Sequence, residues 1–83
     1  MLKDYEWEFC LALHKKLKEK VKGKIFTTVK EDKLIVEVTM GKVEFQMGFD
    51  KFAYKISEGY TTDDVVLDVT KAYRSFLNDL YFV

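Results

Sequence analysis

Between residues 24 and 57, apolar and polar residues alternate, and short polar breaks interrupt the alternation at 31–32, 41–42 and 50–51. A period of two is that of a half-buried antiparallel strand. The break at 41–42 is Gly41-Lys42, and a two-residue loop that opens with glycine suits a type II′ turn. The pattern therefore predicts four strands joined by three consecutive hairpins.

The breaks also predict which residues face one another across each hairpin. Around Gly41-Lys42 the facing pairs are Met40 with Val43, Val38 with Phe45, Val36 with Met47 and Leu34 with Phe49. Around Glu31-Asp32 they are Val29 with Leu34, Thr27 with Val36 and Ile25 with Val38; around Asp50-Lys51 they are Phe49 with Phe52, Met47 with Tyr54 and Phe45 with Ile56. A slip of one residue would turn each apolar set to solvent, so we expect this register to be strongly specified.

The alternation separates an apolar face of the sheet from a polar one. The apolar face carries Ile25, Val29, Leu34, Val36, Val38, Val43, Phe45, Met47 and Phe49. The opposite face is mostly polar and carries Thr28, Lys30, Glu37, Thr39, Glu44, Gln46 and Lys55. We therefore expect other elements to cover the first face, while the second meets water or a partner.

Two amphipathic helices are predicted to flank the strands. Residues 3–21 repeat apolar residues at three- and four-residue spacing, which gives one stripe of Leu2, Tyr5, Phe9, Leu13, Leu17 and Val21. Residues 62–81 do the same with Val66, Val69, Tyr73, Phe76 and Leu80. Thr61 or Thr62 is the expected N-cap of the second helix, and Asp63 and Asp64 follow in its first turn.

These elements predict a single α+β domain over residues 1–83 with the order αββββα, an antiparallel meander with two helices packed on one face. The segment 51–57 has two interpretations. Its alternation of Phe52, Tyr54 and Ile56 favours a strand, whereas Asp50 could instead cap a short helix. With a short extra helix at 51–57 the order becomes αβββα, which has the outline of a double-stranded-RNA-binding domain.

Composition, charge and cysteine content narrow the class of protein. Fourteen Lys and Arg balance fourteen Asp and Glu, so no overall field draws the chain to nucleic acid or to an anionic membrane. The chain is 48% hydrophobic, a composition that excludes disorder. Cys10 is the only cysteine, which fits a reducing cytoplasm. Neither a signal peptide nor a membrane span is recognisable, so we expect a soluble cytoplasmic protein.

Little in the sequence points to catalysis. Cys10 and His14 lie one helical turn apart and would make half of a zinc site, but no second cysteine or histidine completes it. Asp63, Asp64 and Asp68 are expected to cap and solubilise the second helix. The glycines form neither a GxGxxG motif nor a P-loop. We therefore expect a non-enzymatic protein with no catalytic residue, metal, cofactor or small-molecule substrate.

Lysines crowd the end of the first helix and the residues after it: Lys15, Lys16, Lys18, Lys20, Lys22 and Lys24. Clustered lysines contact phosphate without sequence preference, so they are the candidate nucleic-acid contact. The helix macrodipole, however, favours cations at a C-terminus in any protein, and this chain has neither net positive charge nor an arginine besides Arg74. Nucleic-acid binding is therefore the alternative function.

Apolar residues near the two chain ends are the stronger functional signal. Packing on the apolar face of the sheet does not obviously bury Trp7, Leu11, Tyr81 or Phe82. Trp and Tyr are the residue types that dominate protein–protein hot spots. Two outcomes stay open. Either the helices pack on one another and bury these side chains, or Trp7, Leu11, Tyr81 and Phe82 form an interface for a protein partner or a homodimer.

Three stretches carry a resemblance to a group of known proteins. Asp4-Tyr5-Glu6-Trp7-Glu8-Phe9, Leu11-Ala12-Leu13-His14-Lys15-Lys16 and the ending Leu77-Asn78-Asp79-Leu80-Tyr81-Phe82-Val83 resemble small uncharacterised proteins of phages and prophages of Gram-positive bacteria. The resemblance brings no functional motif and no site residue. It implies a phage accessory protein that works in the host cytoplasm by binding a host or phage macromolecule, and with the surplus of aromatic residues it favours a protein-binding module.

Overall fold

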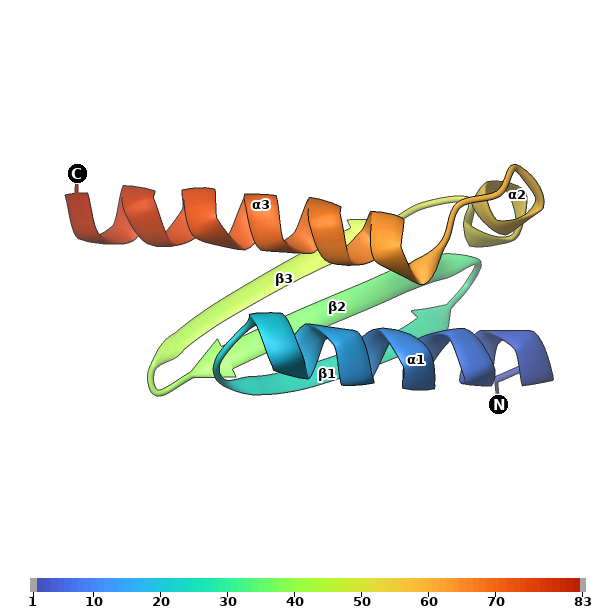
Figure 1. Cartoon of the computed structure of the whole chain (residues 1–83), viewed down its shortest axis with the longest axis horizontal. Helices are drawn as coiled ribbons and strands as arrows, with labels where there is room; N and C mark the ends of the chain where they lie inside the picture. Colours follow the sequence, from blue (N-terminus) through green and yellow to red (C-terminus); the bar gives the residue numbers. More distant parts are fainter. Residues whose placement is uncertain (1, 83) are drawn as a thin grey trace.

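The computed structural model describes the backbone of residues 2–82 and the side chains of residues 2–80. These residues form α1 (Asp4–Lys20), β1 (Lys24–Lys30), β2 (Lys33–Met40), β3 (Val43–Phe49), α2 (Phe52–Ser57) and α3 (Thr62–Phe82). The strands make one antiparallel sheet in the order β1-β2-β3. Helices α1 and α3 lie side by side over one face of this sheet, so the fold is α+β with two layers (Figure 1).

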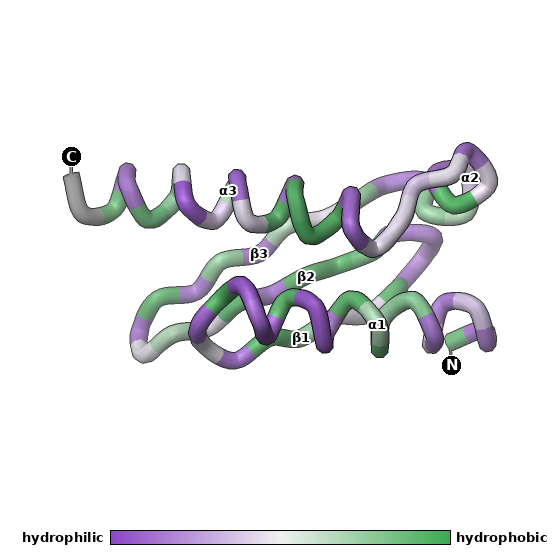
Figure 2. Tube along the Cα trace, in the orientation of Figure 1, coloured by the Kyte–Doolittle hydropathy of each residue, from purple (hydrophilic) through white to green (hydrophobic). Residues whose placement is uncertain are grey.

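The register predicted for the first two hairpins is confirmed. Val38 of β2 faces Ile25 of β1 on one side and Phe45 of β3 on the other. The remaining predicted pairs of these hairpins are also present: Thr27 with Val36, Val29 with Leu34, Val36 with Met47, Leu34 with Phe49 and Met40 with Val43. Gly41 has a φ of 62°, the sign that the first central residue of a type II′ turn requires. The central strand β2 is mainly hydrophobic along its length (Figure 2).

Both long helices pack most of their apolar stripes on the predicted face of the sheet, but Leu80, the last residue of the stripe predicted for α3, is 50% exposed. The buried residues of α1 include Cys10, Leu13 and Leu17, and those of α3 include Val65, Val69 and Tyr73. The stripe of α1 is turned slightly from the predicted one, because Tyr5 is exposed and Glu6 is buried. The carboxylate of Glu6 accepts the backbone N–H of Lys3 at 2.9 Å, which satisfies one donor at the start of the helix.

The start of α3 confirms one of the two predicted caps. Oγ1 of Thr61 accepts the backbone N–H of Asp64 at 3.3 Å, and Oδ2 of Asp64 accepts the N–H of Thr61 at 2.9 Å. This reciprocal pair is a capping box in which Asp takes the place of the more usual Glu. Thr61 rather than Thr62 is therefore the N-cap, and Thr62 is the first residue of the helix.

The prediction of a fourth strand at 51–57 is wrong. Residues Phe52–Ser57 form the helix α2, so the sheet has three strands and the third hairpin does not exist. The pairs Phe49 with Phe52, Met47 with Tyr54 and Phe45 with Ile56 are therefore absent. The order follows the other interpretation of this segment, αβββα with a short extra helix between the sheet and the last helix.

Contacts with the β1–β2 turn, which is distant in sequence, explain why residues 52–57 form a helix instead of a strand. Lys51 has a φ of 54°, which turns the chain away from the path of β3. The carbonyl oxygen of Asp32 then accepts the N–H of Phe52, and its Oδ1 accepts the N–H of Ala53, both at 2.9 Å. These two bonds satisfy orphan donors at the start of α2. Phe52 is fully buried and packs edge-on against Phe9 with ring centroids 5.0 Å apart.

Candidate functional site

The outward side of α1 carries two exposed apolar residues. Trp7 is 56% exposed and Leu11, one turn further on, is 50% exposed. Successive residues of a helix are turned by about 100°, so this side lies roughly opposite Phe9 and Lys16. Phe9 packs on α2 through Phe52, and Lys16 bonds α3 through Asp63, so those residues mark the inward side. The packing of α1 on α3 therefore does not bury Trp7 and Leu11.

Trp7 and Leu11 lie on the side of α1 that faces the free edge of β1. Helix α1 packs on β1 and on α3, and Oγ1 of Thr27 in β1 donates to the carbonyl oxygen of Cys10 in α1 at 3.3 Å. Because β1 is the first strand of the sheet, no described segment pairs with its outer edge. An edge strand presents unpaired backbone N–H and C=O groups, so apolar side chains and open hydrogen-bonding groups meet here.

A third exposed apolar residue, Phe26, lies on the other side of the same edge. It belongs to β1 between the inward-facing residues Ile25 and Thr27, and it is 56% exposed on the open face of the sheet. Phe26 is not among the predicted interface residues, although its parity relative to Ile25 places it on the open face of the sheet. We call Trp7, Leu11, Phe26 and the outer edge of β1 the α1–β1 edge surface.

Two of the predicted interface residues lie outside this description. The side chains of Tyr81 and Phe82 are not among the described residues, so the structure brings together Trp7 and Leu11 alone from that set.

The predicted nucleic-acid residues are divided by the fold. Lys16 is engaged with the start of α3, where its Nζ donates to Thr62 Oγ1 at 2.7 Å and to Asp63 Oδ1 at 2.9 Å. The other candidates, Lys15, Lys18, Lys20, Lys22 and Lys24, are exposed. Helix N-termini attract phosphate, but that of α3 already holds the carboxylates of Asp63 and Asp64.

The remaining residues considered for chemistry, Cys10, His14 and Asp68, are all buried or partly buried. Cys10 is buried, and burial raises the pKa of its thiol, although the hydrogen bond with Thr27 acts in the opposite direction. His14 is half-buried on the same helix. Asp68 accepts the hydroxyl of Tyr60, and burial together with this carboxylate raises the pKa of Tyr60. Within residues 2–80, no cluster of three or more His, Cys, Asp or Glu side chains could hold a metal ion.

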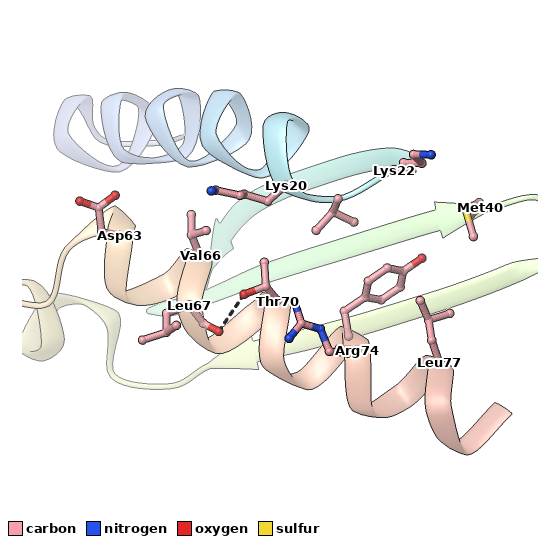
Figure 3. Close-up of a pocket in the computed structure, with 11 residues that line it drawn as sticks. Lys20, Lys22, Met40, Asp63, Val66, Leu67, Thr70, Arg74 and Leu77 are labelled. Atoms are coloured by element: carbon pink, nitrogen blue, oxygen red, sulfur yellow. Dashed lines mark hydrogen bonds between the residues drawn. The ribbon is translucent and has the colours of Figure 1, made fainter. Parts of the chain in front are cut away.

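A second surface feature, which the sequence did not indicate, is a groove where α1 ends and α3 continues past it (Figure 3). Its volume is about 680 Å³. One wall comes from the end of α1 and the residues after it, the other from α3, and the end of β2 contributes Met40; the lining residues are Lys20, Val21, Lys22, Met40, Asp63, Val66, Leu67, Thr70, Tyr73, Arg74 and Leu77. We call this feature the α1–α3 groove.

No protein-family model, no curated protein and no solved structure matches this chain. Among the helices that the structure describes, none combines the length and the apolar character that crossing a membrane would require.

Proposed function

We propose that this protein is a non-enzymatic protein-binding module and that the α1–β1 edge surface is its contact site. The observation that carries the proposal is the exposure of Trp7 and Leu11 beside an unpaired strand edge. Helix α1 does pack on α3, but with the side that carries Phe9 and Lys16, so this packing leaves Trp7 and Leu11 exposed. An exposed Trp with an apolar neighbour one turn away is a typical anchor for a protein partner.

The chemistry of the edge favours an extended segment as the bound element. A partner strand that pairs with β1 would gain main-chain hydrogen bonds, and its side chains would alternate between the two faces of the sheet. On one face it would meet Trp7 and Leu11, and on the other it would meet Phe26. Lys24 and Lys30 end the strand, and charges at strand ends restrain uncontrolled edge pairing. The uncharged middle, Phe26 to Thr28, remains open to a specific partner.

A second copy of the chain is one partner of this kind, because two β1 edges can pair antiparallel about a two-fold axis. The resemblance to small phage and prophage proteins supports an accessory protein that binds a host or phage macromolecule, and we propose that it acts in the cytoplasm of the host.

Sedimentation velocity and capture from a bacterial lysate test this proposal. We expect the wild-type protein to self-associate or to retain a protein, and the double variant Trp7→Ala/Leu11→Ala to lose that binding by at least tenfold. The matched control is Tyr54→Ala/Leu80→Ala, which removes an aromatic and a leucine of similar exposure from α2 and α3. Equal binding by both double variants, or a monomer that captures nothing, would contradict the proposal.

Nucleic-acid binding is the second candidate, supported by the exposed lysines at the end of α1. It ranks lower because Asp63 already engages Lys16 and the net charge is zero. Its signature is salt dependence: on duplex DNA the logarithm of affinity falls with the logarithm of salt by about 0.9 per neutralised phosphate. An electrophoretic shift assay at low salt with duplex DNA, single strands and duplex RNA tests it. No shift at about 100 μM protein would remove this candidate, since non-specific binders are usually occupied there.

A further inference from the structure

The α1–α3 groove has the size and lining of a small-molecule site. Ligand sites in proteins usually enclose about 300–1,000 Å³ and are mostly apolar with a few convergent polar groups; this groove measures about 680 Å³. Its apolar lining comes from the residue after α1, from β2 and from α3, and includes Val21, Met40, Val66 and Leu77. It lies on the inward side of α1, so it is separate from Trp7 and Leu11 and is independent of the proposed function.

A buried polar atom without a partner belongs to this groove. Tyr73 is only 7% exposed, and its hydroxyl has no hydrogen-bond partner among the described residues. A buried hydroxyl without a hydrogen bond costs roughly 1–3 kcal/mol, so such groups are rare and require an explanation. Replacement of the tyrosine by phenylalanine would avoid that cost. A ligand oxygen that accepts this hydroxyl would account for it.

The charges around the groove are mainly positive. Lys20, Lys22 and Arg74 line it and are exposed, whereas the one acidic lining residue, Asp63, is engaged by Lys16 at 2.9 Å. Figure 3 shows Lys20 and Lys22 on the side of α1, with Arg74 across from them on α3. An anion is therefore favoured at this site although the whole chain is neutral.

We propose that the α1–α3 groove binds a free single-chain amphipathic carboxylate, whose tail lies on the apolar lining and whose head accepts the Tyr73 hydroxyl near the basic side chains. Access to the hydroxyl requires a lining side chain to move. Among the lining residues, Met40 has a flexible side chain that is 37% exposed. A partner helix fits the groove less well, because it would present apolar side chains and leave the hydroxyl unpaired. A membrane surface fits less well because the neutral chain has no field directed at one.

Titration of the wild-type protein with decanoate, below the concentration at which it forms micelles, tests the site. We expect saturable binding of one decanoate, with the largest NMR shift changes at Met40, Tyr73 and Leu77. Decyltrimethylammonium has the same tail with the opposite charge, and acetate has the head without the tail. Both should bind at least tenfold more weakly. Equal binding of decyltrimethylammonium, shift changes confined to another surface, or binding to anionic lipid vesicles but not to decanoate would overturn the proposal.

Two substitutions separate the hydroxyl from the charges. Tyr73→Phe keeps the ring and should weaken decanoate binding about tenfold, the loss expected for one hydrogen bond to a charged group; Tyr54→Phe, at an exposed tyrosine on α2, should leave it unchanged. Arg74→Gln changes an exposed residue and should weaken binding severalfold, while Lys42→Gln in the β2–β3 loop should not. If Tyr73→Phe and Arg74→Gln both bind as the wild type does, the groove is not the site. Thermal unfolding of each variant tests whether it is folded. If Tyr73→Phe does not fold, Arg74→Gln alone decides whether the groove is the site.

Discussion

The two hairpin turns of the sheet have the same length but different environments. Gly41 in the β2–β3 turn has open space around its Cα, and glycine adopts its φ of 62° without strain. In the β1–β2 turn, Glu31 and Asp32 have φ values of 53° and 59°, the signs of a type I′ turn, which favours Asn and Gly. Asp32 also binds the start of α2. A turn can therefore retain residues that suit its backbone poorly when one of them holds another element.

Removal of the side chain that anchors α2 is expected to have the largest effect. Phe52→Ala should lower the free energy of unfolding by about 3–5 kcal/mol, because Phe52 is fully buried against Phe9 and Tyr5. Denaturant unfolding measures this loss. Tyr54→Ala, at the neighbouring exposed aromatic of the same helix, should change stability by less than about 0.5 kcal/mol. Similar losses for both variants would mean that α2 is not anchored through Phe52.

Removal of the cap from the β1–β2 turn ranks second. Asp32→Ala should cost about 1–2 kcal/mol, because the N–H of Ala53 loses its acceptor while the backbone bond from Phe52 remains. Hydrogen exchange should show faster exchange at Ala53 in this variant. The control is Asp50→Ala, whose exposed carboxylate lies 3.7 Å from Lys33 and should contribute less than about 1 kcal/mol. An unchanged exchange rate at Ala53 would mean that the carboxylate of Asp32 does not cap α2.

Substitution in the unconstrained turn should have a smaller effect. Gly41→Ala meets no neighbouring atom, so its cost is the left-handed backbone alone, about 1 kcal/mol. Gly23→Ala is the contrasting case, since a Cβ there would lie 2.7 Å from the carbonyl oxygen of Thr39. Gly23→Ala should therefore have a lower melting temperature than Gly41→Ala in thermal unfolding. The reverse order would show that neighbouring backbone does not limit residue 23.

The smallest change should be a gain in stability. Glu31→Asn places a residue that tolerates left-handed backbone at a φ of 53°, and we expect about 0.5 kcal/mol of added stability. The same substitution at Glu19, exposed in α1, should lower stability, since Asn is the poorer helix former. Denaturant midpoints of the two variants should therefore move in opposite directions. A loss at both positions would mean that Glu31 is not strained.

The register of the sheet was predictable because it is specified twice. Val38 must meet an apolar residue on each side, and only one parity of β1 and β3 allows this. No such redundancy exists for α2. Phe52 and Ile56 are four residues apart. In a strand this spacing places both side chains on the same face, and in a helix it places them one turn apart, so the spacing fits both structures. The choice depends on Asp32, which lies twenty residues before Phe52 in the sequence and reaches it only in the folded chain.

The candidate surfaces were predictable to different degrees. The sequence indicated Trp7 and Leu11 because their row on the helix lies outside the main apolar stripe. Phe26 could have been found from its parity in β1. The α1–α3 groove could not have been found, because Met40 and Tyr73 look like core residues in any pattern and become groove residues only where α1 ends before α3 does.

The position of Cys10 gives the protein an internal kinetic reporter. Its thiol is buried between α1 and β1, and burial raises its pKa. Alkylating reagents react with an accessible thiolate, so in the native protein they can modify Cys10 only while α1 is displaced from the sheet. The ratio of alkylation rates in the folded and unfolded chain therefore measures how often α1 detaches. Because the sequence has no other cysteine, a single mass shift reports that opening without any engineered label.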